Sequence, residues 1–219
     1  MSEKKPPHEK VHNALSLDGR PESIKQYYAN WAETYDQDVD SKYSGPDFIA
    51  EILANYIESN HNQLDPDRSK ILVADIGCGS GLVGVGLSSR GFVTLDGMDI
   101  SSEMVELAAQ RSIYRDLYFG DDINKPLRPE WRNAYDVSIS CGVFTLGHVD
   151  PEALYPLIDI TRQGGLLITS TRTAYYDATD YQKVSDKIEE EGLVQLKQCL
   201  KDAPYTEDGD AHYWVYEIC

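Results

Sequence analysis

Residues 71–81, ILVADIGCGSG, decide the fold of this chain. The apolar run 71–74 is typical of a buried parallel strand, and an acid, Asp75, follows it. Glycines at alternate positions come next, and residues 82–87 start a helical pattern. A strand, a glycine turn and a helix N-terminus form a place where backbone can closely approach a ligand. The spacing Gly79-x-Gly81-x-x-Gly84 also matches a dinucleotide fingerprint, a pattern that is weak on its own.

The totals predict one soluble globular domain. The chain has 219 residues, of which 41% are hydrophobic and 26% charged. The 37 acidic and 20 basic residues give a net charge of −17, which repels phosphate backbones and anionic lipid, so we expect neither a nucleic-acid nor a membrane partner. Four cysteines without paired spacing predict reduced thiols, no metal site and a cytoplasmic location. Neither a signal peptide nor a spanning run is present, and we expect a monomer or homodimer.

The N-terminal part divides into a polar segment and two helices. Residues 1–20 lack apolar periodicity and predict a flexible tail, and residues 21–219 predict the folded domain. A helix should begin near Pro21 and carry an aromatic stripe with Tyr28, Trp31 and Tyr35. A second helix is expected at about 45–59. Together, 21–60 form a helical segment before a core at 70–219.

The core alternates strand and helix, which is the signature of a mostly parallel sheet covered on both faces. We expect strands near 71–74, 92–98, 117–119, 135–140 and 166–170, then an irregular stretch at 171–176 and a helix near 179–191. Alternating runs at 193–200 and 212–218 suit a terminal antiparallel hairpin at the sheet edge. The predicted fold is therefore α/β, with seven strands of which the last is antiparallel.

Acids stand where the first three strands end, and ligands of open parallel sheets bind beyond these ends. Asp99 lies where an acid can accept both hydroxyls of a ribose, and Asp121 or Asp122 could accept an adenine amino group. A nicotinamide enzyme would also use an acid such as Asp99. Asp75 and the Asp121–Asp122 pair favour a different cofactor.

These motifs resemble those of the class I S-adenosylmethionine methyltransferases. The likeness rests on 75–81, 97–101, 120–123 and 164–166, in the same order along the chain. More narrowly, 28–39 and 164–173 are similar to the Williams–Beuren syndrome region methyltransferase-like family, and the likeness covers about residues 24–218. It implies a Rossmann-like fold, an N-terminal helical lid over 21–60, and S-adenosylmethionine as cofactor with S-adenosylhomocysteine as product.

The resemblance also implies roles for individual residues. The glycine loop (77–81) would contact the amino-acid end of the cofactor, and Asp99 would contact its ribose. Ile100 and Met104 would pack beside its adenine, although ordinary core packing would also explain these apolar residues. The predicted cofactor-binding set is Tyr28, Tyr35, Asp75, Gly77, Cys78, Gly79, Gly81, Asp99, Ile100, Met104, Asp121, Asp122, Ile123 and Cys141. The aromatic helix is either a core helix or a lid whose rings surround the sulfonium.

Methyl transfer needs mainly alignment of the nucleophile, and a base only where the acceptor arrives protonated. His148 is the candidate base, and Tyr28 is a second catalytic candidate; a solvated loop histidine is the alternative reading of His148. Trp31, Arg172, Tyr175 and Tyr176 are expected to line the acceptor pocket, where Arg172 binds a carboxylate or ties down a loop. We expect a small-molecule acceptor of unspecified atom. The alternatives are a non-catalytic S-adenosylmethionine-binding partner or sensor, and an NAD(P)-dependent oxidoreductase.

Overall fold

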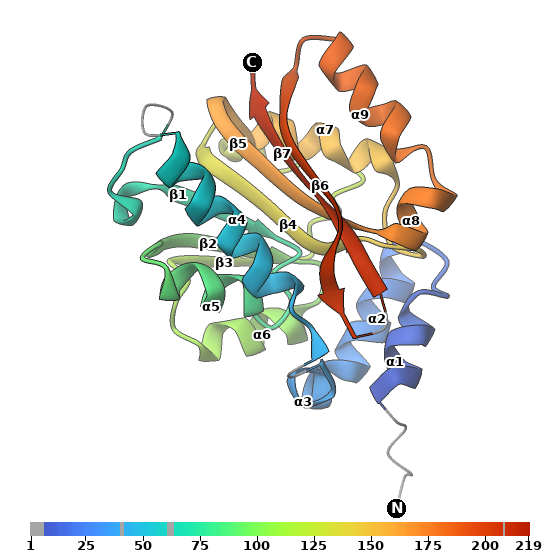
Figure 1. Ribbon diagram of the computed structural model, residues 1–219. Helices are drawn as coiled ribbons and strands as arrows, with labels where there is room; N and C mark the ends of the chain where they lie inside the picture. The colour runs from blue at the N-terminus through green and yellow to red at the C-terminus, as the bar shows by residue number, and fades with distance from the viewer. Residues whose placement is uncertain (1–6, 40–41, 61–63, 208) are drawn as a thin grey trace, which may run out of the picture.

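The strand that precedes the glycine loop is β1 (Leu72–Ile76), and it lies inside a seven-stranded sheet of order β3-β2-β1-β4-β5-β7-β6 (Figure 1). The computed structural model describes residues 7–39, 42–60, 64–207 and 209–219. The other strands are β2 (Thr94–Asp99), β3 (Asp116–Phe119), β4 (Tyr135–Phe144), β5 (Thr161–Arg172), β6 (Val194–Thr206) and β7 (Gly209–Ile218). The pairs among β1 to β5 are parallel, and β7 runs antiparallel to both β5 and β6. The predicted parallel sheet with a terminal antiparallel hairpin is confirmed.

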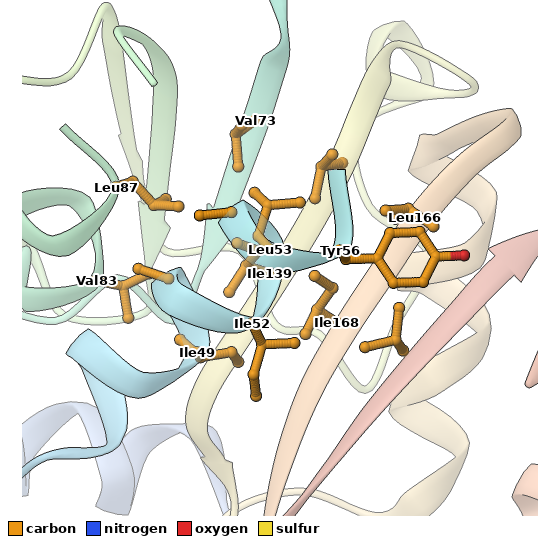
Figure 2. Packing of buried hydrophobic residues seen from close by; sticks show 14 of the residues in the cluster. Ile49, Ile52, Leu53, Tyr56, Val73, Val83, Leu87, Ile139, Leu166 and Ile168 are labelled. Atoms are coloured by element: carbon orange, nitrogen blue, oxygen red, sulfur yellow. The ribbon is translucent and has the colours of Figure 1, made fainter. Parts of the chain in front are cut away.

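Helices cover both faces of this sheet. On one face, α4 (Gly45–Ser59) and α5 (Leu82–Ser89) bury side chains such as Ile49, Leu53 and Leu87 against Val73 and Ile139 of the sheet (Figure 2). On the other face, α7 (Leu154–Ile160) and α9 (Tyr181–Glu190) pack in a second apolar cluster, which includes Leu157, Ile188 and Trp214. Each such buried side chain contributes roughly 1.5–3 kcal/mol. The two clusters therefore hold the strand ends rigidly in place.

The core contains further helical segments. They are α6 (Ser102–Gln110), α8 (Thr173–Ala178) and the single-turn 3-10 helices η3 (Arg68–Lys70), η4 (Pro129–Trp131) and η5 (Pro151–Ala153). Segment 173–178 is thus helical, where the sequence predicted an irregular stretch. Tertiary packing explains this, since Tyr175 of α8 is buried in the second cluster. None of the helices in the described ranges is both long and apolar enough to cross a bilayer.

The N-terminal helices gather at one end of the sheet, near the tip of the β6–β7 hairpin (Figure 1). They are α1 (Pro7–Ala14), α2 (Pro21–Trp31), η1 (Ala32–Thr34) and α3 (Tyr35–Val39). The aromatic stripe expected on one helix is therefore divided between α2 and α3. Tyr43 forms an isolated antiparallel bridge with Thr206, so the segment after α3 is joined to the hairpin.

The prediction of a flexible tail over 1–20 needs correction. Residues 1–6 lie outside the described part, but α1 packs on the following helices with Ala14 buried. The Nζ of Lys10 donates to Asp38 Oδ2 at 2.7 Å, and the backbone N–H of Gly19 donates to Gly147 O at 3.0 Å. Helix α1 has few apolar residues, so its sequence shows no helical period. Contacts with residues distant in sequence hold it in place.

Candidate functional site

A cavity lies beyond the carboxyl ends of the parallel strands, as expected for an open parallel sheet. Its walls come from the segments after β1 to β4, from the last residue of β5, from α1 to α3, and from the tip of the β6–β7 hairpin. Of the residues predicted to bind cofactor or acceptor, the cavity is lined by Tyr28, Trp31, Tyr35, Gly77, Gly79, Asp99, Ile100, Met104, Asp121, Asp122, Ile123, Cys141, His148 and Arg172. Residues from five strand ends and the N-terminal helices thus meet at one place.

The glycine loop is fastened to the neighbouring strand. The backbone N–H groups of Gly77 and Cys78 both donate to Met98 O, at 2.8 and 2.9 Å. Gly77 has φ +75°, and a Cβ there would stand 2.2 Å from Val143 Cγ2, so no side chain fits. Gly79 has φ +54°, yet a Cβ there would meet no described atom within 4 Å. The space in front of Gly79 is open, as a cradle for a ligand requires.

Asp99 stands at the end of β2 with both carboxylate oxygens oriented by backbone. Oδ2 accepts from Gly79 N at 2.9 Å, and Oδ1 accepts from Ser101 N at 2.9 Å. Burial raises the pKa of Asp99, and these backbone donors oppose that rise. Each oxygen keeps a lone pair for a further donor. With the open space at Gly79 and apolar Ile100 and Met104 nearby on the wall, the arrangement fits a nucleoside with a ribose diol.

The two acids after β3 have different partners. Asp121 receives the Arg128 guanidinium, with Nη2 at 2.7 Å from Oδ2. Asp122 accepts from Asn124 N at 3.0 Å and pairs with Lys125 at 3.1 Å. Burial alone would raise the pKa of Asp122, but these donors outweigh burial and lower it. Both acids line the cavity.

The aromatic side chains of α2 and α3 cover the glycine loop. The rings of Tyr28 and Trp31 are stacked at 6.0 Å, and Trp31 meets Tyr35 edge-on at 4.8 Å. Asp36 connects α3 to the loop itself, because it accepts from Ser80 Oγ at 2.5 Å and from Arg111 Nη2 at 2.6 Å. The N-terminal helices are therefore bound to the element that they cover.

His148 and Tyr28 form a hydrogen-bonded pair at the cavity wall. Tyr28 Oη lies 2.8 Å from His148 Nε2, and His148 Nδ1 lies 2.9 Å from Leu146 O. A carbonyl oxygen can only accept, so Nδ1 carries the proton and Nε2 accepts from Tyr28. Burial lowers the pKa of His148, which keeps the ring neutral. His148 is buried and not a solvated loop residue.

The wall beyond β4 contains residues that the sequence analysis did not single out. Tyr43 Oη lies 3.1 Å from Tyr205 Oη and 3.6 Å from Cys141 Sγ, and Ser170 Oγ also contacts that sulfur at 3.6 Å. Burial raises the pKa of Cys141 to about 11, so the thiol stays protonated at pH 7. Tyr43 and Tyr205 are 162 residues apart, and no local pattern pairs them.

Three residues of the glycine stretch predicted to bind cofactor do not line the cavity: Asp75, Cys78 and Gly81. Asp75 is fully buried behind the loop, where Oδ2 accepts from Tyr114 Oη at 2.6 Å and Oδ1 has no partner among the described residues. Burial raises the pKa of Asp75 to about 7. Asp75 and Tyr114 therefore support the loop from behind, a contact that a motif alone does not distinguish from ligand binding.

Tyr175 and Tyr176 were expected in the acceptor pocket, and this placement is corrected. Tyr175 is buried between Phe144 and Tyr181 and donates to Val149 O at 3.0 Å. Tyr176 packs on His212 and donates to Gln182 Oε1 at 2.8 Å. The helical turn of α8 directs both rings into the second cluster.

Within the described ranges, no three His, Cys, Asp or Glu side chains are grouped to hold a metal.

Comparisons with known proteins agree on one class. Residues 73–165 match the family model described as a methyltransferase domain. Methyltransferase-like protein 27 of Homo sapiens is 31% identical over 173 residues, which make up 76% of this chain and 66% of that protein. The 18S rRNA (guanine-N(7))-methyltransferase RID2 of Arabidopsis thaliana is 38% identical over 89 residues, which cover 40% of this chain and 30% of that protein.

A solved structure extends the likeness to the whole fold. The magnesium protoporphyrin IX methyltransferase of Synechocystis PCC 6803, with bound SAH, superposes with a TM-score of 0.65 at 15% identity. The match covers 91% of this chain and 99% of that one. At this identity the likeness concerns the fold alone.

Proposed function

The chain belongs to the S-adenosylmethionine-dependent methyltransferases, with S-adenosylmethionine as its cofactor, and from this premise we propose that it methylates a small-molecule acceptor. The observation that carries the small-molecule part is that segments on two sides partly cover the cavity. Helices α1 to α3 cover it from one side and the hairpin tip from the other, joined by the Tyr43–Thr206 bridge. A covered cavity of this kind favours a compact acceptor over a folded RNA or protein.

In this proposal, Asp99 and the backbone at Gly77 and Gly79 hold the cofactor, and the rings of Tyr28, Trp31 and Tyr35 exclude water around it. Aromatic faces attract a cation by roughly 0.5–2 kcal/mol. When bound, S-adenosylmethionine supplies a methyl group activated by positively charged sulfur.

His148 and Tyr28 would remove the acceptor proton where the acceptor carries one. An acceptor O–H or N–H donates to Tyr28 Oη, while the Tyr28 proton passes to His148 Nε2 across their 2.8 Å hydrogen bond. The bond from Nδ1 to Leu146 O orients the imidazole for this transfer. Burial lowers the pKa of His148, so the base is unprotonated at pH 7 before the acceptor arrives.

The same proposal includes the domain plan and the setting of the protein. Residues 21–219 together with α1 form one methyltransferase domain, in which α1 and 21–60 act as a lid and 70–219 as the core. Its cysteines are free thiols, which favours a reducing compartment such as the cytoplasm. We propose a monomer or homodimer.

Thermal unfolding with separately added ligands tests the cofactor. S-adenosylmethionine or S-adenosylhomocysteine at 100 times its dissociation constant should stabilise the fold by about 2.7 kcal/mol, and NAD or NADP should not. A response to the nicotinamide cofactors alone would contradict the proposal.

Labelled methyl transfer tests the acceptor class. The enzyme, radiolabelled S-adenosylmethionine and a cell extract are incubated, and the extract is then separated by ultrafiltration into small molecules and retained macromolecules. Label in the small-molecule filtrate is expected, and His148→Gln should reduce it. Label in retained RNA or protein would refute the small acceptor. Cofactor binding without label in either fraction would favour a non-catalytic sensor.

A further inference from the structure

Arg172 is the last residue of β5, and its half-buried guanidinium lines the cavity. Its contacts position it without neutralising it. The guanidinium carbon lies 5.6 Å from the ring centroid of Tyr205, and Nη2 would stand 3.4 Å from a Cβ at Gly209. In the described ranges, no carboxylate pairs with the Arg172 guanidinium and no oxygen accepts a hydrogen bond from it.

The other charged side chains of the cavity wall differ in this respect. Most are neutralised by an ion pair, and Asp99 is held by two backbone donors. The ion pairs are Asp38–Lys10 at 2.7 Å, Asp121–Arg128 at 2.7 Å, Asp122–Lys125 at 3.1 Å and Glu207–Lys42 at 3.9 Å. In a protein with 37 acidic residues and 20 basic ones, an arginine without a carboxylate partner is unexpected. Arg172 is therefore available to an anion in the cavity.

Strand order places Arg172 away from the nucleoside side. Asp99 ends β2, Arg172 ends β5, and β1 and β4 lie between these strands. Three strand spacings of about 4.8 Å separate the two ends by roughly 14 Å. Tyr28 and His148 line the same cavity, so a molecule bound at Arg172 shares that cavity with the proposed base.

We propose that Arg172 binds a carboxylate of the methyl acceptor, which makes the acceptor class a small carboxylic acid. The inference rests on the proposed function, because it takes the cofactor to occupy the Asp99 side. A guanidinium receives a carboxylate through two parallel N–H donors, and here it lies 5.6 Å from the ring centroid of Tyr205. A monoanion matches the one cavity cation that has no carboxylate partner in the described ranges, whereas a phosphate dianion would carry a second charge that Arg172 does not neutralise, in a cavity that also contains Asp99.

The cofactor has a carboxylate of its own, so the experiment separates the two sources. Benzoate and its neutral counterpart benzamide are titrated calorimetrically into the full chain, with and without saturating S-adenosylhomocysteine. The variants are Arg172→Gln and Arg172→Lys. Arg132→Gln is the matched control, because Arg132 is 69% exposed and lies outside the cavity. S-adenosylhomocysteine is titrated into each protein separately.

The wild type and Arg132→Gln should bind benzoate about tenfold or more tightly than benzamide. Arg172→Gln should abolish that preference and Arg172→Lys should keep part of it, while affinity for S-adenosylhomocysteine changes less than about twofold. Equal binding of benzoate and benzamide overturns the inference. So does a tenfold loss of S-adenosylhomocysteine affinity in Arg172→Gln, which would assign the arginine to the cofactor.

Failure of the proposed function has a separate signature. If the wild type binds no S-adenosylhomocysteine yet prefers benzoate through Arg172, the anion site stands and methyl transfer does not.

Discussion

In and around the glycine loop, some residues hold the loop in place and others face the cavity. Gly77 is needed because a Cβ would collide with Val143, whereas the space at Gly79 is open although its φ is also positive. Gly77 is required by packing within the protein, whereas Gly79 leaves space for the proposed cofactor. Asp75 and Asp99 show the same division, the first supporting the loop from behind and the second lining the cavity.

Gly79→Ala and Gly192→Ala form a matched pair at this scale. Both glycines have a positive φ, +54° and +70°, and a Cβ at either would meet no described atom within 4 Å. Each variant should lose about 1–2 kcal/mol of unfolding free energy, measured with denaturant. Only Gly79→Ala should also weaken S-adenosylmethionine binding in calorimetry. Equal affinities in the two variants would refute the cradle.

Asp99→Ala should weaken S-adenosylmethionine by about 1.5–3 kcal/mol, because it removes a charged acceptor from the ribose. Calorimetric titration of the folded variant measures this loss. Asp116→Ala, on the exposed edge strand, is the control and should bind as the parent does. An unchanged affinity in Asp99→Ala would mean that the ribose lies elsewhere.

The pH dependence of stability should report Asp75. Burial raises the pKa of Asp75 to about 7, above the ordinary value of about 3.9 for an unfolded chain. The folded state therefore binds the proton more tightly, and this contribution is complete below about pH 4 and lost as pH rises to about 7, at up to about 1.4 kcal/mol per unit. Urea unfolding between pH 4 and 8 should show that slope in the parent and its absence in Asp75→Asn. Parallel curves would contradict it.

At the scale of elements, those with a local sequence pattern could be predicted, and those held by residues distant in sequence could not. The strands and the helices α2, α4 and α9 could be predicted, since the apolar period lies within each segment and a proline stands in the first turn of α2 and α4. The strand-end acids followed from topology. Helix α1 and the Tyr43–Tyr205 wall could not be predicted, because partners remote in sequence stabilise them. The sequence of 171–176 likewise did not show that Tyr175 of α8 would point into the core, because the residues that bury it are remote in sequence.

Helix α1 should slow cofactor release through Lys10. Its Nζ donates to Asp38 at 2.7 Å and to Thr34 at 2.5 Å, and Tyr27 Oη donates to its carbonyl. Lys10→Met removes a charged hydrogen bond, so S-adenosylhomocysteine should dissociate up to about tenfold faster. Stopped-flow fluorescence of the cavity residue Trp31 measures the rate.

The exposed pair Lys183–Asp180 supplies the control for this rate. Lys183→Met should release the product as the parent does. Equal rates in Lys10→Met and Lys183→Met would show that α1 does not restrain the ligand.

At the scale of the whole molecule, charge bears on the acceptor. The net charge of −17 opposes any polyanion, although one relative is named as an rRNA methyltransferase. RNA binding normally draws on many basic contacts to phosphate and strengthens as salt falls. We expect no retention of 18S rRNA fragments in filter binding at about 0.15 M or about 0.05 M salt. Retention that grows tenfold at the lower salt would contradict the acidic-surface argument.

The Tyr43–Tyr205 contact also has a consequence for biosynthesis. Its two partners are separated by 162 residues, so the ribosome delivers the N-terminal helices long before the hairpin that meets them. At 5–20 residues per second the delay is about 8–32 s. During that interval α1 to α3 have no opposing wall, and a nascent chain cannot retain cofactor in a cavity that lacks this wall. Ligand capture should therefore be among the last events of synthesis, after residue 205 has left the exit tunnel.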